Sequence, residues 1–144
     1  MMTTKRKPCA SRSGRPARLS RGVAATELAV CLPIIVLLVV ATIEACSMVF
    51  LKQSLSIAAY EGVRAAVAPA ASTAAINQSC SQVLKDRRIA GGTVTINPGN
   101  VASLKPGNFV DVTVSAPCTG NTVVPNVFYR GKTITATASM MIEF

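Results

Sequence analysis

One carboxylate stands at the head of a long apolar run, and its spacing from a glycine is the first chemical feature of the chain. Gly22 is followed by four residues and then by Glu27, after which the apolar segment begins. A charged side chain at mid-helix in a membrane costs roughly 2.5–3.5 kcal/mol or more, so such a carboxylate needs a partner. The position of Glu27 therefore predicts that it is neutralised by a cation.

The remaining reactive residue types do not form a catalytic or metal-binding pattern. The chain has no His, which excludes His-dependent triads and HExxH zinc sites. Five cysteines are scattered without a CxxC pair, so a zinc ribbon is not expected. No nucleophile-plus-base pattern and no phosphate loop occurs, and Asp111 alternates with apolar neighbours like a solvent-facing strand residue. We therefore expect no enzyme activity, no cofactor and no metal.

The positive charge is concentrated in the first part of the chain. The net charge is +9, and +7 of it precedes Gly22, whereas eight basic and six acidic residues follow. A basic tail ahead of an apolar run is typical of a targeting and topology signal. No aromatic residues interleave with the tail for base stacking, so nucleic acid is not an expected partner. The basic residues of the tail are Lys5, Arg6, Lys7, Arg12, Arg15, Arg18 and Arg21.

The apolar run predicts a single membrane crossing. The mostly apolar residues 28–51 would form a helix of roughly 36 Å, enough for a tilted crossing of a bilayer core near 30 Å. The charge distribution predicts that the N-terminus stays in the cytoplasm and that the C-terminal part is exported. Two alternatives stay open, a cleaved secretory signal with a weak site near Ser54 and Ser56, and a lipoprotein anchored at Cys46.

The opening of the run resembles the processing site of type IV prepilins and pseudopilins, and in more detail the TadE-like proteins of tight-adherence (Tad/Flp) pilus systems. Three stretches carry the resemblance: Arg21-Gly22 to Glu27-Leu28-Ala29 with Leu32-Pro33 and Ile43-Glu44, then Ala59–Ala66, and more weakly Thr135–Met141. Leu28 stands where Phe or Tyr is commoner in the family, and Tyr60 replaces an Arg.

This resemblance implies that a prepilin peptidase cuts after Gly22, so that Val23 becomes the N-terminus. Its free amine would lie about one helical turn from Glu27, and a staggered neighbouring subunit could pair its amine with this glutamate. Pro33 is either a bend or local opening of the helix hydrogen bonds that a membrane segment tolerates, or a neutral kink. Glu44 is either a second membrane acid that pairs with another subunit or a side chain that snorkels to the exported interface.

The implied protein is a pseudopilin or minor pilin in the inner membrane of a bacterium, with the bilayer, other pilin subunits and Tad membrane components as partners. The alternative is an unprocessed signal-anchored or lipid-anchored envelope protein. The predicted segments are a leader at 1–22, a transmembrane helix at 23–51, a helical stalk at 52–68 and an exported domain at 69–144.

Periodicity in the exported part predicts an α+β domain. The face of Leu55, Ala58, Ala59, Gly62, Ala66 and Val67 continues the helix outward, with Glu61 and Arg64 as an i,i+3 pair. A second helix is expected at 73–89, with Ser72 as N-cap and Gly91-Gly92 as the stop. Residues 93–96, 109–114 and 132–142 alternate with period two and predict a three-strand antiparallel sheet, and 121–130 predicts a loop. The basic residues of 85–88 suit a helix end better than a lipid contact.

Cys80 and Cys118 are the only cysteines of the predicted exported part. Oxidation is expected in a bacterial periplasm, and a bridge between them would pin helix to sheet. Closing this loop would remove unfolded-state entropy worth roughly 4 kcal/mol in the chain-entropy model. The alternative is two buried free thiols.

Overall fold

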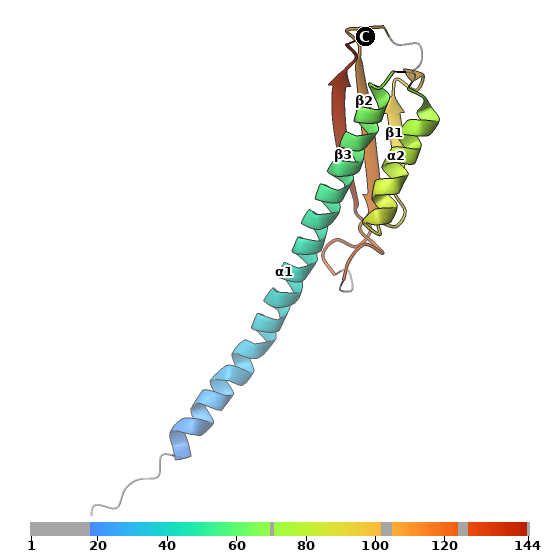
Figure 1. The fold of residues 1–144 in the computed structure, drawn as a ribbon. Coiled ribbons are helices and arrows are strands. Elements are labelled where there is room, and N and C mark those ends of the chain that lie inside the picture. The colour runs from blue at the N-terminus through green and yellow to red at the C-terminus, as the bar shows by residue number, and fades with distance from the viewer. Residues whose placement is uncertain (1–17, 70, 102–104, 124–126, 144) are drawn as a thin grey trace, which may run out of the picture. The chain divides into compact units, whose positions relative to one another are not determined.

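The structure is a computed structural model that describes residues 18–69, 71–101, 105–123 and 127–143, with side chains from residue 22 onward. The basic residues at 5–15 of the predicted leader therefore lie outside the described residues. Leu38–Phe144 forms a compact unit of its own, and the preceding unit ends at Leu37. The element order is two helices followed by three strands, which confirms the predicted α+β class (Figure 1).

Helix α1, Arg18–Ala66, is one continuous helix of 49 residues. It begins five residues ahead of the predicted new N-terminus at Val23, and it continues through Pro33. Proline has no N–H and cannot donate to the carbonyl of Ala29, but a single missing bond does not end the helix. Among the described residues, α1 is the one helix that is long and apolar enough to cross a membrane.

Burial on α1 begins at Glu44. From there one face of the helix packs into the domain at helical spacing, through Glu44, Met48, Leu51, Leu55, Ala58, Ala59, Gly62, Val63 and Ala66. The predicted boundary between a transmembrane helix ending at 51 and a stalk starting at 52 has no counterpart in this packing. Residues 44–66 pack into the same unit as α2 and the sheet, because their apolar face covers the sheet.

Helix α2, Thr73–Asp86, begins where the sequence predicts. The Ser72 hydroxyl accepts a hydrogen bond from the N–H of Ala75 at 3.2 Å and so caps a free donor of the first turn. The helix ends three residues before the predicted end. Arg88 adopts a left-handed φ of 56°, its N–H donates to Lys85 O, and the N–H of Ile89 donates to Leu84 O. This pair of bonds is a Schellman motif, so Arg88 ends the helix and not the predicted Gly91-Gly92.

The three strands form one antiparallel sheet in the order β1-β2-β3. Strands β1, Thr93–Asn97, and β3, Thr133–Met141, both pair with β2, Phe109–Pro117. Alternate residues of β2 are fully buried on one face, and Asp111 lies on the other face, as predicted. Figure 1 shows α2 and the C-terminal part of α1 on the same face of the sheet, and residues from all these elements form one hydrophobic core.

A glycine allows the two helices to approach each other in this core. A Cβ at Gly62 of α1 would collide with the Sγ of Cys80 on α2 and would lie 3.0 Å from Val112 Cγ1 on β2. The predicted α1 face around Gly62 is therefore confirmed as a core face. The predicted pair of Glu61 and Arg64 also forms, at 3.8 Å on the exposed side, where its contribution to stability is small.

Candidate functional site

Gly22 and Glu27 lie on an exposed stretch of α1. A Cβ at Gly22 would meet nothing within 4 Å, and both Val23 and Glu27 are exposed. The Thr26 hydroxyl donates to the carbonyl of Val23 at 2.7 Å, which binds this side chain to its own helix. Within the unit that ends at Leu37, Glu27 is thus available on the surface for a partner from outside.

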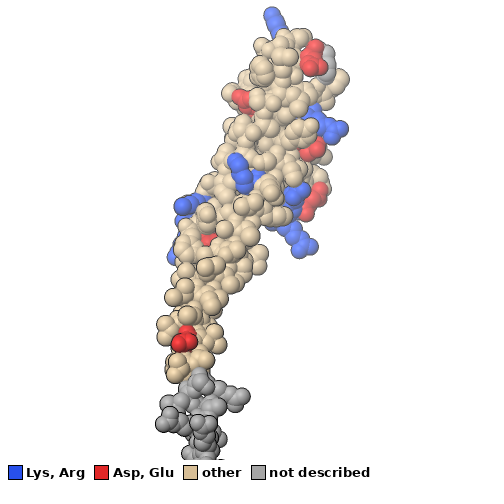
Figure 2. Space-filling view, turned by 90° about the vertical axis from the view of Figure 1, so that its left-hand side faces the viewer, with Lys and Arg blue, Asp and Glu red and all other residues tan. Residues whose placement is uncertain are grey.

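The segment from Val23 to Ile43 is apolar on every side of the helix. Its large apolar side chains are exposed, and Glu27 is its single charged residue. Figure 2 shows this part of α1 as a largely tan surface. At 1.5 Å per residue the segment is about 31 Å long, which matches the bilayer core of about 30 Å. By length and composition this segment is therefore able to cross a membrane.

Glu44 occupies an intramolecular anion site. Its side chain is 0% exposed, and its two carboxylate oxygens accept backbone hydrogen bonds from three consecutive residues of the segment between β2 and β3. The N–H of Phe128 donates at 3.0 and 3.2 Å, that of Tyr129 at 2.9 Å, and that of Val127 at 3.4 Å. Successive N–H groups that converge in this way bind an anion without any cation.

The partner of Glu44 therefore differs from both alternatives that the sequence suggested. The donors that the structure shows come from its own chain, and pairing with another subunit stays a prediction. Residues 127–129 were predicted only as part of a loop, and backbone N–H groups leave no signal in residue types. No sequence pattern could have identified them as ligands of Glu44.

A second polar side chain fixes the same loop near the end of β2. Asn121 Nδ2 donates to the carbonyls of Ala90 at 2.9 Å and Pro117 at 2.8 Å, and its Oδ1 accepts from the Ala90 N–H at 2.8 Å. These bonds place the segment after α2 beside the segment after β2. Residues 124–126, including Pro125, lie outside the described structure.

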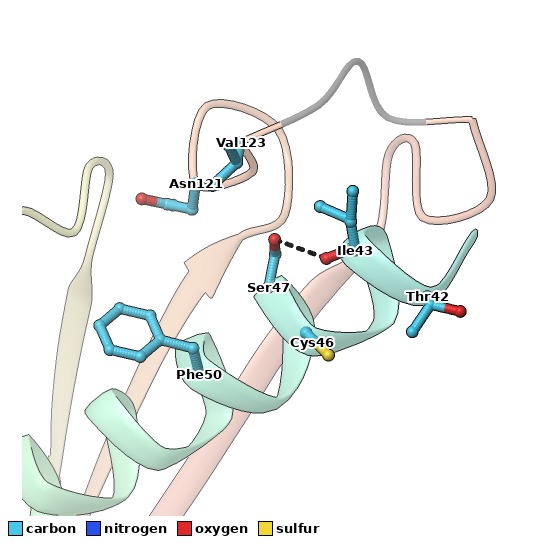
Figure 3. A pocket seen from close by; sticks show the side chains of 7 residues that line it. All are labelled: Thr42, Ile43, Cys46, Ser47, Phe50, Asn121 and Val123. Atoms are coloured by element: carbon cyan, nitrogen blue, oxygen red, sulfur yellow. Dashed lines mark hydrogen bonds between the residues drawn. The ribbon is translucent and has the colours of Figure 1, made fainter. Parts of the chain in front are cut away.

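An open groove of about 440 Å³ lies between this loop and α1. Figure 3 shows its lining residues, which are Thr42, Ile43, Cys46, Ser47, Phe50, Asn121 and Val123. The Ser47 hydroxyl donates to the Ile43 carbonyl at 2.9 Å and the Thr42 hydroxyl to the Leu38 carbonyl at 2.8 Å, so the hydroxyl groups of the helical wall are already satisfied. The groove is consequently suited to apolar contacts. It holds no arrangement of reactive groups.

The predicted disulfide is absent, because the fold holds Cys80 and Cys118 far apart. Both are buried free thiols. Cys80 lies beside Val112 in the middle of β2, and its Sγ donates to the Ala58 carbonyl at 3.3 Å. Cys118 is six residues further along an extended chain, roughly 20 Å away at the rise of a strand. A disulfide requires Cα atoms within about 7 Å, so the prediction of a bridge is corrected to two separate core thiols.

Burial also sets the chemistry of these thiols. Loss of hydration raises the pKa of Cys80, and a hydrogen bond from the residue's own backbone opposes this effect. Burial likewise raises the pKa of Cys118, with Lys132 lowering and Glu44 raising it to smaller extents. Because the thiolate is the reactive form, both residues are less reactive than an ordinary cysteine at neutral pH. They act as small apolar groups in the core.

The structure keeps the predicted site residues in separate places. Gly22, Val23, Glu27 and Pro33 lie in the unit that ends at Leu37, whereas Glu44, Cys80 and Cys118 lie in Leu38–Phe144. Within the described part of the chain, no group of three or more His, Cys, Asp or Glu residues is placed to hold a metal ion. The features that could act are an exposed apolar helix with one acid and a folded unit whose loop is bound to Glu44.

Comparison with known proteins gives one match. No curated protein and no solved structure matches the chain significantly. The family model described as TadE-like protein matches residues 22–64. The matched stretch starts at the glycine of the predicted cleavage site, contains Glu27, Pro33 and Glu44, and ends within the part of α1 that packs on the sheet. Residues 22–64 are thus TadE-like in sequence, and the resemblance predicted for this stretch is confirmed.

Proposed function

We propose that the chain is a pseudopilin or minor pilin subunit of a Tad/Flp-type bacterial pilus apparatus, processed by a prepilin peptidase after Gly22. The observation that carries the proposal is the TadE-like match, which begins at Gly22 and covers an exposed apolar helix with an acid near its start. The exported domain, with its core of α1, α2 and the sheet, is the part that this helix would display.

The proposed mechanism uses the cut to create a partner for Glu27. Cleavage frees the α-amine of Val23, and four helical residues place Glu27 about one turn away. A neighbouring subunit, staggered along the helix axis, brings its amine to this carboxylate and removes the cost of a lone charge in an apolar layer. The large exposed apolar side chains between Val23 and Ile43 supply the surface on which like helices and lipid pack.

Gly22 itself favours processing at this position. It lies inside α1, where a glycine lowers helix stability by about 1 kcal/mol relative to alanine. No other group lies within 4 Å of the position where its Cβ would be. In the proposed orientation the basic leader is cytoplasmic, and the protein sits in the inner membrane with its C-terminal domain on the periplasmic side.

The cleavage step is tested with Gly22→Leu in cells that carry the peptidase, read by intact mass of the membrane-extracted protein. We expect the parent chain to begin at Val23 and the variant to keep its leader. Gly14→Leu, a glycine of the leader without a glutamate five residues later, is the matched control and should be processed normally. A parent chain with an intact leader would identify a signal-anchored protein, and one that begins at a lipid-modified Cys46 a lipoprotein.

The pairing step is tested with Glu27→Ala. Cleavage and membrane insertion should persist, whereas co-purification with pilus components should fall about tenfold or more, since a lost pairing of about 1.4 kcal/mol is already tenfold. Glu61→Ala, at an acid further along the same helix, should leave co-purification unchanged. Undiminished association and normal fibres with Glu27→Ala would count against the pairing role.

A further inference from the structure

Three large apolar side chains are exposed on the loop that Glu44 holds. We call the described residues 119–123 and 127–132 the Glu44 loop. Val123 is 87% exposed, Val127 66% and Phe128 51%. Phe50 of α1, across the groove of Figure 3, is another 50% exposed. Val123 and Phe50 line the same groove, and exposed apolar groups of this kind on a small domain indicate an interaction site.

This surface is also held in place. Three backbone N–H groups of the loop are bound to the Glu44 carboxylate, and the Asn121 side chain makes three hydrogen bonds to Ala90 and Pro117. The hydrogen bonds to Glu44 and Asn121 hold the loop backbone in a conformation that leaves these apolar side chains exposed. The Glu44 and Asn121 side chains therefore determine which residues the loop exposes.

The charges at this end of the domain are mostly positive. The loop residues carry Arg130 and Lys132 and no acid, and the Lys132 ammonium lies 5.2 Å from the centre of the Tyr129 ring. The bonds between Asn121 and Ala90 bring the basic C-terminus of α2, with Arg87 and Arg88, to the same end. Of the acids at this end, Glu44 is fully buried, and Asp86 is exposed on the last turn of α2, where it accepts a hydrogen bond from Gln82 at 3.0 Å. Aromatic and basic residues beside apolar ones are typical of a membrane–water interface.

The position of Glu44 on α1 determines how deep the Glu44 loop lies relative to the bilayer. The segment 23–43, about 31 Å of helix, fills the bilayer core, so Glu44 stands at its edge. Because residues 127–129 are bonded directly to Glu44, the Glu44 loop lies at the level where acyl chains meet headgroups.

We propose that the Glu44 loop is a membrane-interface anchor of the exported domain. Val123, Val127 and Phe128 enter the outer acyl boundary, and the cations that meet anionic headgroups are Arg87, Arg88, Arg130 and Lys132. The proposal rests on the proposed membrane insertion of α1. A second copy of the chain fits this surface less well, because a symmetric contact would oppose the same cations.

A tryptophan reporter tests the proposal, because the chain contains no Trp. Phe128→Trp is made in the full chain and reconstituted in vesicles of brominated phosphatidylcholine with phosphatidylglycerol, where bromine quenches the fluorescence of an indole that touches lipid. The matched control is Phe109→Trp, a similarly exposed Phe at the opposite end of β2, roughly 26 Å from Pro117. Leu37→Trp, on the apolar segment of α1, reports membrane insertion itself.

We expect strong quenching at positions 37 and 128 and little at 109. Quenching at 37 with none at 128, or equal quenching at 109 and 128, overturns the anchor and leaves the membrane segment intact. No quenching at 37 overturns the proposed membrane insertion first. Weak quenching at position 128 that grows as the lipid-to-protein ratio is raised indicates that a second copy covers the loop, and it also overturns the lipid anchor.

The headgroup part of the proposal has its own pair of variants. The double variant Arg87→Ser with Arg130→Ser is made in the Phe128→Trp background. In phosphatidylglycerol vesicles it should lower the ratio of lipid-bound to unbound loop, read from the quenching of the indole at 128, by about fivefold for each cation removed. Arg64→Ser with Lys105→Ser, at exposed cations outside this end of the domain, should leave the ratio unchanged. An equal response of both pairs overturns the role of the loop-end cations.

Discussion

The Glu44 carboxylate accepts the backbone N–H of Phe128, 84 positions later in the chain, at 3.0 and 3.2 Å. One residue of the apolar helix thereby fixes the loop between the last two strands. The contact joins the end of the membrane segment to the folded domain, and it explains why an acid stands at the border of an apolar run. An acid with three backbone donors has no need of a cation.

Glu44→Ala should release the loop. It leaves three N–H groups without their acceptor, and we expect a loss of about 2–4 kcal/mol in the free energy of unfolding, because hydrogen bonds to charged groups are the stronger ones. Glu44→Gln keeps one acceptor oxygen and should lose about half as much. Thermal unfolding in detergent and amide exchange at 127–129 measure both effects. Glu61→Ala is the control, and normal protection of these amides in Glu44→Ala would refute the clamp.

Gly62→Ala should destabilise the core although alanine favours helix. The added methyl group collides with Cys80 Sγ, and overpacking of this kind costs about 1–3 kcal/mol. Adding Cys80→Ala removes the sulfur and should recover part of the loss, with a coupling energy of about 0.5–3 kcal/mol in the double-mutant cycle. Unfolding curves of the four proteins give this value, and strictly additive effects would show that the two positions do not touch.

Arg88→Gly should stabilise the end of α2. Arg88 has a φ of 56°, a conformation that is strained for a residue with a Cβ and free for glycine. We expect a gain of about 0.5–1 kcal/mol after the larger chain entropy of glycine is subtracted. Arg87→Gly, next to it at a φ of −92°, should bring no gain. The midpoints of thermal unfolding compare the two, and a gain at residue 87 alone would contradict the Schellman geometry.

Cys80 and Cys118 should both be alkylated in unfolded protein without prior reduction. Mass spectrometry of non-reduced peptides, with thiols blocked during isolation, should find each one modified singly. In native protein both should react slowly at neutral pH, because burial raises the pKa of each thiol. A linked Cys80–Cys118 peptide would contradict the separation of the two sites.

The same pKa shifts predict a pH dependence of stability. The folded state keeps these thiols protonated at a pH where the unfolded chain ionises them. Their contribution to stability is therefore complete below the ordinary thiol pKa of about 9 and is lost as the pH rises past it. Cys80→Ala with Cys118→Ala should flatten the fall of the unfolding temperature above this pH. An unchanged profile would assign the fall to other groups.

The sequence by itself determined the features that depend on neighbours along the chain. The length of the apolar run predicted a helix able to cross a membrane, Ser72 predicted the start of α2, and alternation predicted three strands near their true bounds. The family resemblance was likewise contained in consecutive residues at 22–64. Helix periodicity, capping and strand alternation are local effects, so residue order reveals them.

Only the tertiary structure decided in which surroundings residues of the same type lie. Most apolar residues before Glu44 are exposed and one apolar face after it covers the sheet, but burial in protein and burial in lipid select the same residue types. The donors of Glu44 are backbone groups present at nearly every residue, so composition could not assign them. The sequence predicted a bridge between Cys80 and Cys118. The fold places Cys80 beside the middle of β2 and Cys118 beyond its end. Contacts between distant positions depend on how the elements pack, and the packing follows from the whole chain at once.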